Sequence, residues 1–142
     1  MTLRGLAYGG RVRPLPALGL DVLVVVAFAA AGRRTHAGEV DVAGVLGTAA
    51  PFLAALAAGW LALRAWRNPD AVLRTGVPLW LVTLLGGMVL RRLAGEGTAT
   101  PFVVVAALVL AAGLVGWRLL AAVPRQRSRA SSSSARDASS QA

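Results

Sequence analysis

The sequence predicts an all-α integral membrane protein, an antiparallel bundle of four transmembrane helices. Apolar residues make up 56% of the 142 residues, whereas soluble domains contain roughly 45–50%. A small domain leaves a large share of its surface facing water, so a single core of this size cannot hide so many apolar side chains. The apolar residues also gather into four runs that are nearly free of charge. Lipid is therefore the expected solvent for these runs.

The four apolar runs cover residues 18–32, 42–63, 77–90 and 101–123. A helix of about 20 residues spans the roughly 30 Å hydrocarbon core, so the second and fourth runs are long enough to cross it. The third run is short and crosses only if Arg91 and Arg92 extend outward or the bilayer thins. Backbone groups in lipid must be satisfied within their own segment, and no run alternates with a period of two, so all four are expected to be helices.

Short connections between the runs predict that neighbouring helices are antiparallel within one transmembrane domain at 15–123. A cytoplasmic arm at 1–14 precedes this domain. A tail rich in Arg and Ser follows it at 124–142 and is expected to be disordered, because it cannot bury enough apolar area. Pro51 lies inside the second run and predicts a kink there.

The formal net charge of +9 comes from 15 arginines without any lysine. Eleven arginines lie in the N-terminal arm, the middle connection and the C-terminal side, and four lie in the other two connections. Cytoplasmic segments are the richer in basic residues, so both termini are expected in the cytoplasm. The composition is typical of a GC-rich bacterial genome, which suggests a bacterial plasma membrane.

The basic residues bear on two classes of partner, anionic lipid and nucleic acid. Arg125, Arg127 and Arg129 lie just beyond the fourth run, where each could attract anionic lipid, although they could equally serve only to fix the topology. Nucleic acid is not expected as a partner, because no aromatic residues are interleaved with the arginines to stack on bases.

The first run has a second interpretation. Arg4, Arg11 and Arg13, the apolar stretch after them and the alanines at 29–31 resemble the three regions of a cleaved signal peptide. Asp21 at the base of the run and the diarginine after it are unusual in signal peptides. A retained first helix is therefore the favoured prediction.

Asp21 is the most informative acidic residue, because a carboxylate at the centre of a transmembrane helix costs about 2.5 to 3.5 kcal/mol. It could reach headgroup water or form an ion pair with Arg64 or Arg118, which are expected at the same membrane level. A proton or cation relay is the functional alternative.

A second polar group is expected on the opposite side of the membrane, formed by Arg33, Arg34, His36 and Arg91. It could bind an anion or simply anchor the helices at the interface. A single histidine and no cysteine give no basis for a metal or another cofactor. No nucleophile and base with usable spacing is present, so an enzyme is not expected.

Aromatic and small residues complete the candidate positions. Four tryptophans are predicted to anchor helix ends at the interface: Trp60, Trp66, Trp80 and Trp117. Close helix contact is predicted for Gly86 and Gly87 in the third run. In the second run it is predicted for one face made of Gly47, Ala50, Ala54 and Ala58.

Taken together, these residues resemble a family of small membrane proteins catalogued as domain of unknown function 3054. The resemblance covers about residues 18–119 and rests on short motifs spread over the four runs: Asp21, Phe28, 32–36 (GRRTH), 48–52 (TAAPF), Gly59-Trp60, Trp80, Thr83, Gly87-Met88, Leu90-Arg91, Phe102 and Trp117-Arg118. It implies a four-span bacterial or archaeal membrane protein and supplies no activity, substrate or catalytic residue.

The favoured function is that of a noncatalytic membrane protein, associated through small-residue faces with a second copy or with another membrane protein. The alternative is a small oligomeric transporter or channel, with Asp21 and the Arg33, Arg34, His36 and Arg91 group along its pathway. Four short helices enclose little polar volume, so this alternative would need a dimer.

Overall fold

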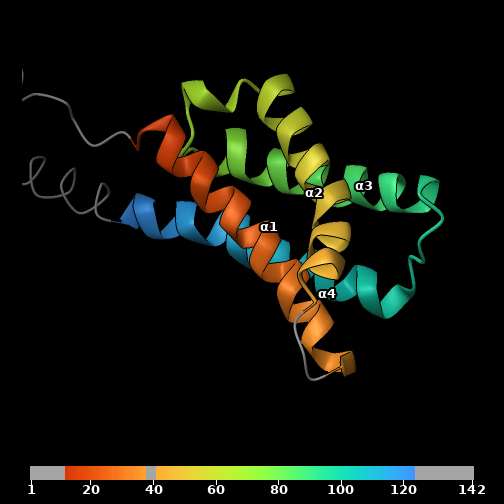
Figure 1. Ribbon diagram of the computed structural model, residues 1–142. Coiled ribbons are helices and arrows are strands. Elements are labelled where there is room, and N and C mark those ends of the chain that lie inside the picture. The colour runs from red at the N-terminus through yellow and green to blue at the C-terminus, as the bar shows by residue number, and fades with distance from the viewer. Residues whose placement is uncertain (1–11, 38–40, 124–142) are drawn as a thin grey trace, which may run out of the picture.

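The computed structural model describes residues 12–37 and 41–123, with side chains in the first helix described as far as residue 33 (Figure 1). Four helices make up most of this part of the chain: α1 (Pro14–Ala37), α2 (Val42–Ala62), α3 (Val77–Leu93) and α4 (Thr100–Leu110). No strand occurs among the described residues. Most of the N-terminal arm and the whole basic tail, including Arg125, Arg127 and Arg129, lie outside them.

Two π-helical turns lengthen the helices. The turn η2 (Val72–Gly76) leads directly into α3, and the turn η3 (Ala111–Val115) continues α4 toward residue 123. With these turns, the four helical stretches contain 20, 21, 22 and 24 residues. Each is long and apolar enough to cross a membrane. The all-helical membrane fold class is thereby confirmed, whereas the antiparallel order of neighbours stays a prediction.

The third helix is longer than the 14-residue apolar run suggested. Its membrane-crossing stretch begins at Val72 and ends at Leu93. Arg74 interrupts the apolar sequence but lies within the π turn, so it does not interrupt the helix. The extra turn removes the need for local bilayer thinning, because about 20 residues already match the hydrocarbon core.

Local sequence explains where the helices begin. Asp41 caps α2, where its carboxylate accepts hydrogen bonds from the backbone N–H groups of Ala43 and Gly44 at 3.1 and 3.0 Å. Pro101 stands in the first turn of α4, where the missing N–H costs nothing, and Pro78 stands just after the π turn that leads into α3. Pro51 lies inside α2, and the helix continues through it. The kink expected there stays a prediction.

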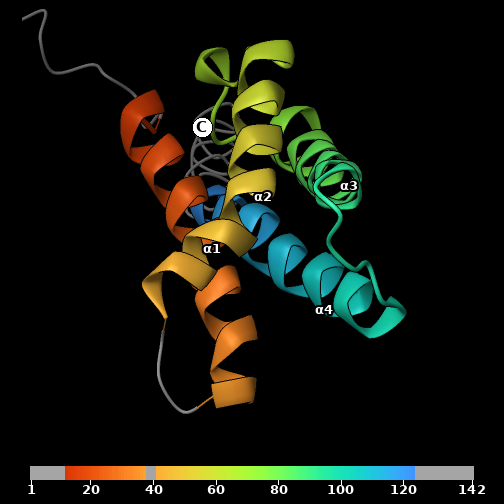
Figure 2. The same ribbon diagram turned by 45° about the vertical axis from the view of Figure 1, so that its right-hand side comes forward.

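An aromatic cluster joins α1, α2 and α4, with Phe102 in the first turn of α4. The Phe28 ring from α1 meets the Phe52 ring from α2 edge-on, with centroids 5.3 Å apart, and Phe102 from α4 lies 5.9 and 6.3 Å from these two rings. α3 contributes Gly87, at which an added Cβ would overlap the Phe52 ring. All four helices therefore meet in one layer, although they cross rather than run side by side along their whole lengths (Figures 1 and 2).

The small residues of α2 do not pack as expected within the chain. Gly47, Ala50, Ala54 and Ala58 are all exposed. The buried face lies on the other side of the helix: Val45, Ala49, Phe52, Ala55, Leu56, Gly59 and Trp60. The expected close contact does form at α3, where Cβ atoms added at Gly86 and Gly87 would meet Ala55 and Phe52.

Candidate functional site

Asp21 is completely buried although it carries a carboxylate. It lies seven residues into α1, about 10 Å along the axis from Pro14. The apolar run around it favours a helix, and burial of the residues one turn away, Ala17 and Val25, shows that Asp21 shares the inward face of that helix. Because Asp21 is buried, its carboxylate oxygens must accept their hydrogen bonds from other groups of the protein.

Arg118 is the charged partner of Asp21. Its NH1 and NH2 groups donate to Oδ1 and Oδ2 of Asp21 at 2.9 and 2.8 Å, which is a two-pronged contact. Both side chains have no exposed surface. The geometry matches the planar fork of a guanidinium to a carboxylate. The first helix and the end of the fourth helical segment are thus tied together across 97 positions of sequence.

Two tryptophans complete the binding of the carboxylate. The Nε1–H of Trp60, in α2, donates to Oδ2 at 3.0 Å, and the Nε1–H of Trp117 donates to Oδ1 at 2.9 Å. Each oxygen of Asp21 thus accepts two hydrogen bonds. The Trp117 ring also lies 4.4 Å from the guanidinium carbon of Arg118, within the range of a cation–π contact.

The remaining donors of Arg118 are directed to backbone carbonyls. Its Nε–H donates to the oxygen of Pro69 at 2.8 Å, and NH1 also donates to the oxygen of Leu114 one turn earlier. Gly76 makes room for the side chain, because an added Cβ would lie 2.9 Å from Arg118 Cδ. The network therefore also fixes the connection between α2 and α3.

The electrostatics of this Asp21–Arg118 network are balanced. One negative and one positive charge meet in a dry interior, and both carboxylate oxygens and most guanidinium donors are occupied. A buried pair of this kind is strongly destabilised by loss of one partner. All four hydrogen bonds to the carboxylate come from side chains of other helical segments, so the arrangement joins these segments to α1.

A family model described as protein of unknown function (DUF3054) matches residues 18–121 of the chain. The chain belongs to the DUF3054 family. The resemblance seen in the sequence is thereby confirmed, and the match contains every side chain of the Asp21–Arg118 network. No curated protein and no solved structure matches the chain.

The second polar group expected in this DUF3054 member consists of Arg33, Arg34, His36 and Arg91. In the structure, Arg33 and Arg91 interact with different partners. Arg33 lies 3.9 Å from Asp41, with both side chains well exposed. The Arg91 guanidinium lies 2.7 Å from a Glu96 oxygen and 4.4 Å from the centre of the Phe102 ring. Among the interactions of the described residues none joins Arg33 to Arg91. The side chains of Arg34 and His36 lie outside the described residues.

Sequence reasoning missed the role of the tryptophans. Besides Trp60 and Trp117, the Nε1–H of Trp80 also points inward and donates to the backbone oxygen of Ala107 at 3.0 Å, just before the π turn in α4. Trp66 is 46% exposed, and for it the role of interface anchor stays a prediction. One feature of the sequence could have indicated this role: Trp60 and Trp117 lie at the same membrane level as Asp21, near the corresponding ends of their helices.

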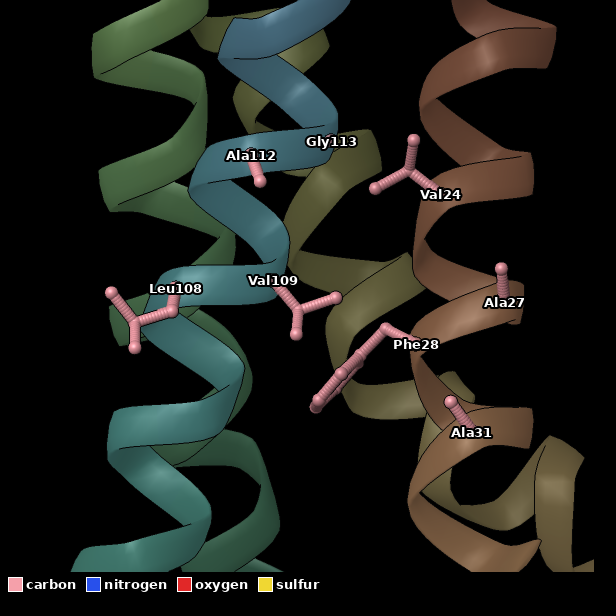
Figure 3. A pocket seen from close by; sticks show the side chains of 8 residues that line it. All are labelled: Val24, Ala27, Phe28, Ala31, Leu108, Val109, Ala112 and Gly113. Atoms are coloured by element: carbon pink, nitrogen blue, oxygen red, sulfur yellow. The ribbon is translucent and has the colours of Figure 1, made fainter.

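Metal-binding clusters and grooves are the other features of the described residues that bear on ligand binding. No group of three or more His, Cys, Asp or Glu that could hold a metal occurs among them. A groove of about 550 Å³ lies between α1 and α4, and Figure 3 shows that side chains from these two helices line it without a single polar group. Such a lining can contact hydrocarbon but cannot orient a polar substrate.

Proposed function

We propose that this DUF3054 member is a noncatalytic, multi-pass protein of the bacterial plasma membrane that associates through α2 with a second copy or with another membrane protein. One observation carries the proposal: the small residues Gly47, Ala50, Ala54 and Ala58 are exposed on α2. At 100° per residue they fall on one face, opposite the face packed against the rest of the chain.

Lipid chains are as apolar as leucine, so helices associate in membranes through close packing rather than through the hydrophobic effect. Small residues allow that approach. This chain already uses the same device internally, where Gly86 and Gly87 of α3 receive Ala55 and Phe52 of α2. The outer face of α2 repeats the pattern without a partner in the described part of the chain, which supports a helix from another molecule as its neighbour.

The proposal includes an orientation with both termini in the cytoplasm. Arg13, Arg64, Arg67 and Arg74 belong to the end of the molecule near the Asp21–Arg118 network, whereas Arg33, Arg91 and Arg92 belong to the other end. The excess of arginine at the first end supports its placement on the cytoplasmic side. The basic tail is proposed to contact anionic lipid on that side.

A small oligomeric transporter remains the alternative, but the Asp21–Arg118 network gives it less support. Asp21 is held by four hydrogen bonds from three side chains. A passing proton or cation would have to displace Arg118 from a buried pair, which is costly. The noncatalytic, associating protein requires no such rearrangement.

Cysteine crosslinking tests the proposed association, because the chain has no Cys. Ala54→Cys in native membranes is expected to give a crosslinked species at twice the chain mass or at the mass of the chain plus a partner. Val104→Cys on α4, which is 50% exposed, is the matched control and should give none. Equal crosslinking at both positions, or none at Ala54→Cys, would contradict association through this face.

A further inference from the structure

A second groove lies between α3 and α4, and unlike the groove in Figure 3 it has an arginine and a threonine among its lining residues. Its volume is about 410 Å³, and its apolar lining consists of Leu85, Met88, Val89, Leu93 and Val103. Leu85, Val89 and Leu93 are more than half exposed. The groove therefore opens sideways, toward the hydrocarbon that surrounds the membrane-crossing helices.

Two polar residues, Arg92 and Thr98, border this otherwise apolar groove, and Arg92 is exposed. Arg92 stands in the last turn of α3 and Thr98 just before α4, so both lie where the chain leaves the apolar helices (Figure 1). Arg92 NH1 donates to the Thr98 hydroxyl oxygen at 3.1 Å. Glu96, the nearby acid, is engaged by Arg91 instead. Among the described residues, no carboxylate forms an ion pair with Arg92.

We propose that this groove binds an anionic phospholipid, with an acyl chain along Leu85, Val89 and Val103 and the phosphate on Arg92. The charge arrangement selects this occupant. A helix of another protein would need an acidic side chain placed at the level of Arg92, whereas every anionic phospholipid joins hydrocarbon to an anion in the required order. Arg92 supplies the charge-assisted hydrogen bonds that phosphate oxygens accept.

The selectivity must come from the headgroup. An acyl chain is surrounded by apolar groups in the bilayer as well as in the groove, so the apolar lining gives shape but little preference between lipids. One arginine near the membrane surface supports about a fivefold preference for an anionic over a zwitterionic headgroup. This lipid contact differs from the one proposed for the basic tail, since Arg92 belongs to the opposite end of the helices.

Native mass spectrometry of the full chain tests this assignment. Phosphatidylglycerol and phosphatidylcholine with identical acyl chains are added in equal amounts, and the bound lipids are counted. We expect about fivefold more bound phosphatidylglycerol, and loss of that preference in Arg92→Gln. Arg67→Gln removes one exposed charge at the other end and should keep the preference. Val89→Phe fills the open groove and should reduce binding of both lipids.

Four results would overturn the proposal. Equal binding of the two lipids to the unmodified chain would remove the role of the anionic headgroup. An equal loss of preference in Arg92→Gln and Arg67→Gln would reduce the effect to overall charge. Displacement of phosphatidylglycerol by inorganic phosphate alone, or dissociation of a dimer in Val89→Phe, would show that the groove holds a free anion or a second copy instead.

Discussion

At the scale of single residues, the Asp21–Arg118 pair makes the strongest prediction about stability. Asp21→Asn leaves the buried Arg118 guanidinium without a counterion, and Arg118→Gln leaves a buried carboxylate. Each change is expected to lower the free energy of unfolding by about 3–5 kcal/mol. Unfolding in a titration of denaturing detergent measures this loss. Asp21→Leu combined with Arg118→Met removes both charges, and should therefore cost less than either single change.

Asp41→Asn is the matched control for the loss of an aspartate charge. Asn caps a helix as well as Asp does, and the pair of Asp41 with Arg33 is exposed and 3.9 Å long, so it contributes little. A change within about 0.5 kcal/mol is expected. If Asp21→Asn were as mild as this control, the buried network would not be what holds α1 to the other helices.

The sequence identified half of this network. Asp21 was informative because a carboxylate is expensive in lipid, and Arg118 was one of two arginines at a suitable level. Trp60 and Trp117 were assigned to the interface instead, because an indole near a helix end satisfies its N–H equally well with headgroup water or with an internal acceptor. Which partner the indole binds depends on the rotation of each helix about its axis. The sequence does not indicate that rotation, because these helices are apolar on all sides.

At the scale of helices, the contact between α2 and α3 depends on Gly87. A Cβ added there would overlap Phe52 Cδ1, and the Phe52 ring is fully buried against Phe28 and Phe102. Gly87→Ala is therefore expected to destabilise the protein by about 1–3 kcal/mol, as overpacked cores are. The same detergent titration measures it.

Gly116→Ala is the control for this prediction, because a Cβ at Gly116 meets nothing within 4 Å. Alanine favours a helix over glycine by up to about 1 kcal/mol, so this variant should be neutral or more stable. Similar effects of the two substitutions would show that backbone preference, rather than contact with Phe52, sets the outcome at Gly87.

The helices themselves were predictable in number and approximate position, but not in their exact course. Apolar runs locate membrane-crossing segments well because the bilayer requires about 20 apolar residues. The π turns at Val72–Gly76 and Ala111–Val115 leave no such mark, since one wider turn hardly alters the apolar pattern. The small residues of α2 illustrate the same limit: their shared face was evident, whereas its exposure depends on the packing of the other helices.

At the scale of the whole molecule, the network predicts that α1 is retained. Cleavage after the alanines at 29–31 would remove Asp21 and leave Arg118 buried in the remaining helices without its acid. An unpaired arginine in the hydrocarbon costs about 2.5–3.5 kcal/mol on insertion scales. Intact-mass analysis of the purified chain is therefore expected to show a mass that includes the whole of α1. A chain beginning near Gly32 would contradict the assignment of the first helix.

Reporter fusions can test the orientation of the retained helices. Fusions after Gly38 and Gly97 are expected outside, and fusions after Asn68 and Ala142 inside, because the second set lies with the larger number of arginines. Arg64→Gln combined with Arg67→Gln weakens the signal of the middle connection, but nine of the eleven arginines still stand on the cytoplasmic side against four on the other. The pattern should therefore survive this double change, and an outside C-terminus in the unmodified chain would overturn the orientation.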